Sequence, residues 1–192
     1  MEPKPPLPPR PWWPERFNLW GRHRALIEHE RALARWLHRA TLTPWALLAL
    51  TAASRLGDGP LWFAVVLLLP WLDTARGGVH SLHIVAVSAI NLAIYGAVKH
   101  STARPRPFRG CPGIRECARS LDEHSFPSGH AMHAVAFAVM LGAFYPAAAM
   151  AVWTFAAFTA VSRVMLGLHY PSDVAAGSAI GGAVAGISLQ FL

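Results

Sequence analysis

Long apolar runs without charge constrain what this chain can fold into. No charged residue occurs from Leu61 to Leu69 or from Ala134 to Leu141, and Ser172 to Leu192 contains only Asp173, near its start. A soluble helical protein needs charged residues along the outer face of each helix. The chain as a whole is 54% hydrophobic and 14% charged, whereas soluble domains are about 25% charged. The sequence therefore predicts an all-α, polytopic membrane protein.

Apolar segments and helix-breaking residues divide residues 41–192 into six short spans, which we treat as one membrane domain. The expected spans are Thr41–Leu56, Leu61–Leu72, Ser81–Val98, Ala131–Phe144, Ala147–Leu168 and Ser172–Leu192. The first two are shorter than the about 20 residues that usually cross a bilayer, so tilted or re-entrant segments are expected there. The turn Gly57-Asp58-Gly59-Pro60 separates them. Four glycines in the last span favour close helix packing in lipid. They are Gly177, Gly181, Gly182 and Gly186.

Residues 1–40 form a separate N-terminal region. Met1–Pro14 is too rich in proline for a helix and is expected to be extended or disordered. From Phe17 to Ala40, leucines recur at helical spacing and arginines occupy the opposite face, which predicts a basic amphipathic helix. The leucines are Leu19, Leu26, Leu33 and Leu37, and the arginines are Arg24, Arg31, Arg35 and Arg39. We expect this helix to lie at the headgroup level of an anionic leaflet, or alternatively to pack on the rest of the protein.

Polar residues gather at the ends of spans three to six. If each span crosses once, the end of the third, the start of the fourth, the end of the fifth and the start of the sixth lie on one side of the membrane. The residues at these ends are Lys99 with Arg106-Pro107, Pro127-Ser128-Gly129-His130, Ser162-Arg163 with His169, and Asp173. Topology alone therefore predicts that they converge on one pocket.

The residue types in this pocket point to phosphate chemistry. Lys99, Arg106 and Arg163 suit a small polyanion, because the arginine fork in particular matches phosphate oxygens. Ser128 and the backbone N–H groups beside it add donors where the dipole of the fourth span is positive. An acid, a nucleophile and an orienting carboxylate are also available. These are supplied by His130, His169 and Asp173. This set of residues requires no metal or other cofactor.

The same segments resemble the three signature motifs of the type-2 phosphatidic acid phosphatase superfamily. They read Lys99-x6-Arg106-Pro107, Pro127-Ser128-Gly129-His130, and Ser162-Arg163-x5-His169-x3-Asp173. The third is the most specific, because it fixes four residues at two spacings. The resemblance runs from Lys99 to Asp173, implies a six-span membrane fold, and leaves residues 1–40 outside it.

The resemblance also implies a role for each matched residue. His169 would attack phosphorus and carry the phosphoryl group, Asp173 would orient it, and His130 would protonate the leaving oxygen. The remaining residues would hold the phosphate oxygens. They are Lys99, Arg106, Ser128, Gly129 and Arg163.

The expected activity is metal-independent hydrolysis of a lipid phosphate monoester or pyrophosphate through a phosphohistidine. Undecaprenyl pyrophosphate, phosphatidate and phosphatidylglycerophosphate all stay open as substrates, and the expected partners are this lipid and the bilayer. One alternative is a lipid-phosphate binder or transporter without catalysis. Vanadium haloperoxidases share the motifs but are large soluble proteins. Nucleic acid is not expected as a partner, because neither basic segment carries a recognised binding motif.

The loop between spans three and four raises the question of sidedness. Basic residues 1–40 are expected in the cytoplasm of a bacterial inner membrane, which places the pocket on the periplasmic side after three spans. Cys111 and Cys117 could form a disulfide on that side, and a metal site is their weaker alternative. The many arginines of this loop argue against that orientation. Among them, Arg104 and Arg109 are expected to be solvated loop charges.

Overall fold

The computed structural model describes residues 24–120 and 122–192, and within this part of the chain the protein is helical, with no strand. The helices are α1 (Arg24–His38), α2 (Pro44–Gly57), α3 (Pro60–Leu72), α4 (Gly77–Thr102), α5 (Pro107–Gly110), α6 (Gly129–Phe144), α7 (Ala149–Met165) and α8 (Pro171–Ser188). Short 3-10 turns are η2 (Arg39–Leu42), η3 (Pro146–Ala148) and η4 (Leu189–Phe191). The all-α prediction is confirmed for these residues. The proline-rich tail lies outside them.

Among the described residues, three segments are long and apolar enough to cross a membrane. They are Gly77–Thr102, Pro146–Met165 and Pro171–Phe191. Helices α2 and α3 meet the same criterion only together, as a pair bent by 50°, and α6 is apolar but shorter. The expected count of six spans is therefore not confirmed: the described residues contain three such segments, or four if the bent pair counts as one span, and α6 is too short to meet the criterion. Gly59, with a φ of 137°, and Pro60 break the helix at this bend.

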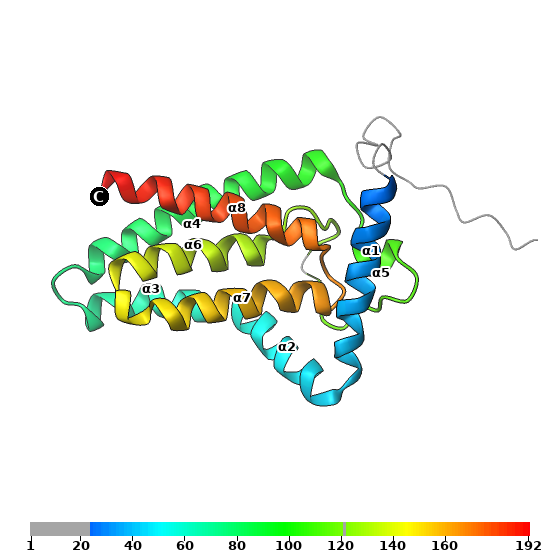
Figure 1. Ribbon diagram of the computed structural model, residues 1–192. Helices are drawn as coiled ribbons and strands as arrows, with labels where there is room; N and C mark the ends of the chain where they lie inside the picture. Colours follow the sequence, from blue (N-terminus) through cyan, green and yellow to red (C-terminus); the bar gives the residue numbers. More distant parts are fainter. Residues whose placement is uncertain (1–23, 121) are drawn as a thin grey trace, which may run out of the picture.

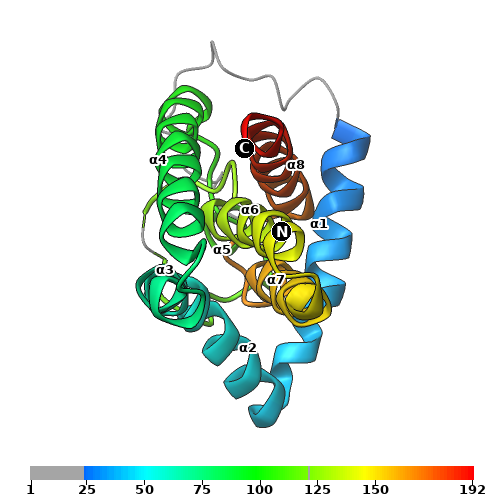
Figure 2. The same cartoon turned by 90° about the vertical axis from the view of Figure 1, so that its left-hand side faces the viewer.

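Helix α6 occupies the middle of the bundle, with α4, α7 and α8 around it (Figure 2). Its contact with α8 is close enough to require glycine. A Cβ on Gly177 would lie 2.3 Å from the Ser128 carbonyl oxygen, and one on Gly181 would lie 2.0 Å from that of Met132. A Cβ on Gly186 would meet nothing within 4 Å. The predicted glycine packing therefore holds at Gly177 and Gly181, which bring the start of α8 against the start of α6.

Helix α1 lies across one end of the bundle (Figure 1). Its packed face contains Ala34 and His38, whose imidazole Nδ1 is 2.7 Å from the Met165 carbonyl oxygen. Leu26 and Leu33, on the predicted apolar face, are 68% and 45% exposed. The helix therefore packs on the protein through Ala34, His38 and the neighbouring Leu37, while Leu26 and Leu33 of the leucine face point away from it. Binding of that leucine face to headgroups stays a prediction.

Candidate active site

The segments that carry the predicted site residues meet at the end of the bundle that α1 crosses (Figure 1). These segments are the end of α4, the loop after it, the start of α6, the α7–α8 turn and the start of α8. Six of the eight predicted residues are at most 5% exposed: Lys99, Arg106, Ser128, Arg163, His169 and Asp173. Gly129 and His130 are partly buried. The predicted convergence is therefore present in the fold.

The tautomer of His169 follows from its hydrogen bonds. Backbone turns after α7 fix the residue, since its N–H donates to the Arg163 carbonyl at 3.1 Å. Its Nδ1 is 2.6 Å from the carbonyl oxygen of Ser125, which can only accept, so Nδ1 carries the proton. The lone pair is then on Nε2, which lies 3.4 Å from Arg106 Nη1. The lone pair of His169 Nε2 is thus held beside the guanidinium of Arg106.

Burial and neighbouring cations keep this imidazole neutral. The pKa of His169 lies well below its ordinary value, first because the ring is buried and then because Arg106, Arg163 and Lys99 repel a second positive charge. A neutral imidazole has the lone pair that attack on phosphorus needs. The electrostatics of the site therefore favour the nucleophilic form at neutral pH.

The carboxylate of Asp173 fixes the turn that carries His169. Its Oδ2 accepts from the backbone N–H of Tyr170 at 2.7 Å and closes a capping box at the start of α8. The same oxygen is 3.7 Å from His169 Nδ1. Its Oδ1 accepts from Arg104 Nη1 at 2.5 Å. In this arrangement the imidazole Nδ1–H donates its hydrogen bond to the Ser125 carbonyl, and Asp173 is a charged neighbour of the ring.

Arg104 corrects an expectation from the sequence. It is 5% exposed rather than solvated, and besides Asp173 it pairs with Glu30 of α1 at 2.6 Å. Arg109 is exposed as expected. The difference arises because a buried carboxylate lies within reach of Arg104 alone, and no sequence pattern indicates that Glu30 supplies a second one.

Two of the predicted phosphate-binding cations share a carboxylate that lies in no motif. Asp122 accepts from Arg106 Nη2 and from Lys99 Nζ, each at 2.8 Å, and from the hydroxyl of Tyr95 at 2.5 Å. Burial alone would raise the pKa of Asp122, but the hydrogen bonds from Lys99 and Tyr95 and the charge of Arg106 hold it well below its usual range. Asp122 therefore faces both cations as an anion.

Arg163 and His130 are both contacted by the bend between α2 and α3. The guanidinium of Arg163 donates to the hydroxyl of Ser54, and its buried Nε has no hydrogen-bond partner among the described residues. His130 Nε2 pairs with the carboxylate of Asp58. Sequence reasoning identified this segment only as a helix break, since nothing in its pattern indicates which distant residues it will meet.

The start of α6 completes the site. Ser128 is its N-cap: the hydroxyl is 3.4 Å from the Ala131 N–H, and the Ser128 N–H donates to the Asp173 carbonyl at 2.9 Å. A Cβ on Gly129 would lie 2.8 Å from Cε2 of Tyr95. Glycine therefore lets the N-terminus of α6, with its partial positive charge, approach the Tyr95 and Lys99 side of the site.

Cys111 and Cys117, which the sequence offers as a possible disulfide, are both free thiols in this structure. Cys111 is buried, and its sulfur lies 3.4 Å from a guanidinium nitrogen of Arg35. Cys117 packs in a different apolar cluster, near Leu50 and Leu166. The two thiols are directed to separate parts of the protein, although only five residues lie between them.

The N-terminal region, which lies outside the matched motifs, reaches the pocket through α1. Helix α1 contacts the site directly, because Glu30 accepts from both Arg104 and the Ser172 N–H. The bent pair α2–α3 leads away from this end and α4 returns to it (Figure 1). The chain thus runs to the far end of the bundle and back between α1 and the site, and both lie at the same end of the bundle.

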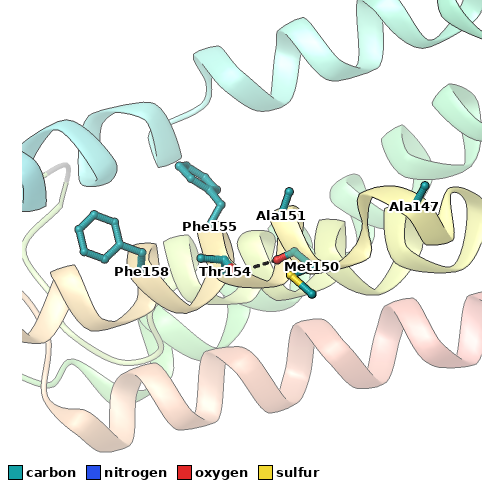
Figure 3. Close-up of a pocket in the computed structure, with 6 residues that line it drawn as sticks. All are labelled: Ala147, Met150, Ala151, Thr154, Phe155 and Phe158. Atoms are coloured by element: carbon teal, nitrogen blue, oxygen red, sulfur yellow. Dashed lines mark hydrogen bonds between the residues drawn. The ribbon is translucent and has the colours of Figure 1, made fainter.

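Other parts of the described chain do not form a rival site. Within residues 24–120 and 122–192, no group of three or more His, Cys, Asp or Glu side chains is arranged to hold a metal ion. A surface hollow on α7 and η3 is shown in Figure 3. Its lining is Ala147, Met150, Ala151, Thr154, Phe155 and Phe158. It contains no titratable group and lies on a helix that can span a membrane, so it is not a candidate catalytic site.

Comparison with known proteins gives one family. The model of the PAP2 superfamily matches residues 80–192. The "Decaprenylphosphoryl-5-phosphoribose phosphatase" of Mycobacterium tuberculosis (strain CDC 1551 / Oshkosh) is 31% identical over 146 residues, which cover 75% of this chain and 79% of that protein. The "Probable lipid phosphate phosphatase beta" of Arabidopsis thaliana is 35% identical over 131 residues, covering 53% of this chain. The chain spans only 61% of the length of the Arabidopsis protein.

Two crystal structures share the fold. That of Aquifex aeolicus LpxE has a TM-score of 0.74 at 22% identity, covering 83% of this chain and 93% of that chain. That of a transmembrane PAP2 type phosphatidylglycerolphosphate phosphatase from Bacillus subtilis has a TM-score of 0.71 at 23% identity, covering 87% and 86%. The likeness extends beyond the residues that the family model matches and includes most of the bundle.

Proposed function

The chain belongs to the PAP2 superfamily, and on this premise we propose that it is an integral membrane phosphatase that hydrolyses lipid phosphates through a phosphohistidine at His169. One observation carries the proposal. The Ser125 carbonyl accepts the Nδ1 proton of His169, which leaves the lone pair of Nε2 beside Arg106. A buried neutral imidazole facing a phosphate-binding cation is suited to nucleophilic attack rather than to recognition alone.

The reaction then follows from the residues around this nitrogen. Nε2 of His169 attacks phosphorus as the bond to the lipid oxygen breaks, and His130 gives a proton to that oxygen. Arg106, Arg163 and Lys99 stabilise the charge on the transferring group. Water then attacks the phosphohistidine, with His130 taking its proton, and inorganic phosphate leaves. Asp173 stabilises the positive charge that His169 acquires while it carries the phosphoryl group.

The proposed substrate is a phosphate ester whose lipid chains stay in the bilayer. Named relatives and structural neighbours act on prenyl-linked, lipid A and glycerolipid phosphates according to their names. These compounds share a phosphate on a membrane lipid but not a tail, and the cationic side chains of the site described above suit the phosphate. Undecaprenyl pyrophosphate, phosphatidate, phosphatidylglycerophosphate and decaprenylphosphoryl-5-phosphoribose are therefore the panel to test.

We place the site on the cytoplasmic face of the membrane, in contrast to the orientation expected from sequence. Positive residues in short loops favour the cytoplasm. In the described turns at the far end of the bundle, 73–76 and 145–148, Arg76 is the one basic residue. The site end has many more, including Arg31, Arg35, Arg39, Arg104, Arg109, Arg115 and Arg119. Free cysteines remove the argument for an oxidising compartment, and α1 shares the side of the site.

The decisive experiment is capture of the covalent intermediate. Detergent-purified wild type and His169→Ala are mixed with ³²P-labelled lipid phosphates in excess EDTA, quenched in alkali and separated on a gel. We expect label on the wild type, stable to alkali and lost in acid, together with phosphate release, and neither in the variant. Phosphate release without labelled protein, or equal release by His169→Ala, would contradict the phosphohistidine. Binding of the lipid by both proteins with no release would support the binder or transporter instead.

A further inference from the structure

The bend between α2 and α3 brings a carboxylate to the site from outside the matched family region. Asp58 is paired with Nε2 of His130, 72 residues away in the chain. The family model begins at residue 80, so its motifs do not include Asp58. The same carboxylate is 4.0 Å from Arg163 Nη1. Asp58 thus contacts the proposed acid and lies beside a phosphate-binding cation.

The geometry of the bend holds Asp58 in this position. A Cβ on Gly57 would lie 2.9 Å from Cγ2 of Thr159 and 3.7 Å from Cδ2 of His130, so the end of α2 packs tightly on α7 and α6. Gly59 has a φ of 137°, which favours glycine, and the Asp58 N–H donates to the Arg55 carbonyl at 3.1 Å. These constraints on both neighbours leave little freedom for the carboxylate between them.

The charges around His130 show what Asp58 contributes. Burial disfavours a positive charge on His130 most, and Arg163 from α7 and Arg106 just before α5 add to this effect. His169 from the α7–α8 turn also lies near enough to act on that charge. Asp58 is the carboxylate in direct contact with the ring. An opposite charge within about 4–6 Å favours the charged form of a titratable group. The carboxylate therefore offsets the arginines that the phosphate requires.

We propose that Asp58 is a positioning residue that holds the Nε2–H of His130 and keeps the imidazole protonated, so that its Nδ1 proton is the one given to the leaving lipid oxygen. This inference rests on the proposed phosphatase function. As the phosphorus–oxygen bond breaks, the Nδ1 proton passes to the lipid alkoxide and His130 becomes neutral, still bound to Asp58. The neutral ring then accepts a proton from the water that attacks the phosphohistidine.

Leaving-group dependence separates this role from a structural one. An alkoxide of a lipid needs a proton as it leaves, whereas p-nitrophenolate does not. We expect Asp58→Asn to lower kcat on dioleoyl phosphatidate by about 10²-fold, the lower end for loss of general acid catalysis, and to lower kcat on p-nitrophenyl phosphate far less. The basic limb of the kcat profile should move to lower pH by about one unit or more. Asp58→Glu should recover part of both effects.

The matched control is Asp73→Asn. Asp73 also lies in a turn between two helices and accepts from backbone N–H groups and the Tyr145 hydroxyl, but at the far end of the bundle. Asp73→Asn should leave kcat on both substrates and the pH profile of kcat unchanged. If Asp58→Asn lowers kcat equally on both substrates and leaves the basic limb of the pH profile in place, the positioning role is overturned.

A measurement without turnover keeps this inference separate from the proposed function. ¹³C NMR of histidine-labelled protein, with His130 assigned by His130→Gln, follows protonation of the ring directly. In Asp58→Asn the titration midpoint of His130 should fall, even if no lipid is hydrolysed by the wild type. An unchanged midpoint would overturn the inference whatever the catalytic result, while absence of turnover with a shifted midpoint would overturn only the phosphatase proposal.

Discussion

Asp173 is held more closely by Arg104 than by His169: its Oδ1 lies 2.5 Å from Arg104 Nη1, whereas its Oδ2 lies 3.7 Å from His169 Nδ1. Both partners of the short contact are buried, and Glu30 of α1 holds the other guanidinium nitrogen. The carboxylate beside the nucleophile is therefore tied to a helix outside the matched motifs. The N-terminal helix is thus connected to the turn that carries His169 through Arg104, and also through the Ser172 N–H, which donates to Glu30.

Arg104→Ala should destabilise the protein and nearly abolish turnover. Removing one partner of a buried ion pair leaves an uncompensated charge, at a cost of about 3–5 kcal/mol. Thermal unfolding in detergent, together with phosphate release, checks both effects. Arg109→Ala, at an exposed arginine of the same loop, should resemble the wild type. Similar behaviour of the two variants would mean that the Arg104–Asp173 pair contributes little.

Asp122→Asn should strengthen binding of phosphate. The anionic side chain of Asp122 contacts Lys99 and Arg106, the same cations that the phosphate is proposed to bind, so it competes for them. We expect the inhibition constant of inorganic phosphate to fall by about tenfold, equivalent to about 1.4 kcal/mol. Glu123→Gln, at the exposed neighbouring acid, serves as the control. A constant that is unchanged or higher would show that Asp122 orients the cations instead of competing for them.

The acid limb assigned to His169 should lie well below pH 6.5. Burial and the nearby cations lower the pKa of this imidazole from 6.5. Protonation removes the nucleophile only as the pH falls through that lowered pKa. The stability that the neutral ring contributes is present above the unfolded pKa of about 6.5 and is lost progressively as the pH falls from there through the lowered pKa. The kcat/KM profile is measured with phosphate esters that differ in the second pKa of their own phosphate group, so that a limb caused by the substrate can be recognised. A limb at or above 6.5 that does not move with the ester would contradict the assignment.

Gly177→Ala should lower stability, while Gly186→Ala in the same helix should not. A Cβ at Gly177 would be 2.3 Å from the Ser128 carbonyl oxygen, whereas one at Gly186 would meet nothing within 4 Å. Overpacking of this kind costs about 1–3 kcal/mol. Replacing glycine by alanine in an open helical position gains about 0.5–1 kcal/mol. Unfolding in detergent measures the change in the free energy of unfolding for each variant. Equal changes for the two variants would mean that the α6–α8 contact is looser than described.

Labelling of single cysteines should show that the site end of the bundle faces the cytoplasm. In a Cys111→Ala, Cys117→Ala background, Glu116→Cys lies at the site end and Ala75→Cys in the far turn, and both positions are exposed. A membrane-impermeant maleimide should label Glu116→Cys in inverted vesicles and Ala75→Cys in right-side-out vesicles. The opposite pattern would restore the orientation first expected from the sequence.

Local patterns were enough to predict the membrane-helical class and the convergence of Lys99, Arg106, His130 and His169. Charge-free runs and fixed motif spacings are properties of short segments, so they can be read along the chain without knowing how its helices pack. The alternation of spans then brings segment ends to one side of the membrane whatever the details of that packing. These features were therefore determined by the sequence alone.

Tertiary structure decided the remaining features, because each depends on how helix ends meet. Asp58 reaches His130 only because α2 bends by 50° into α3 against α7. Arg104 is buried only because Glu30 and Asp173 approach it from both termini of the described chain. The cysteines stay apart because each enters a different apolar cluster. Periodicity indicates which face of a helix is apolar, but not which distant residue covers it.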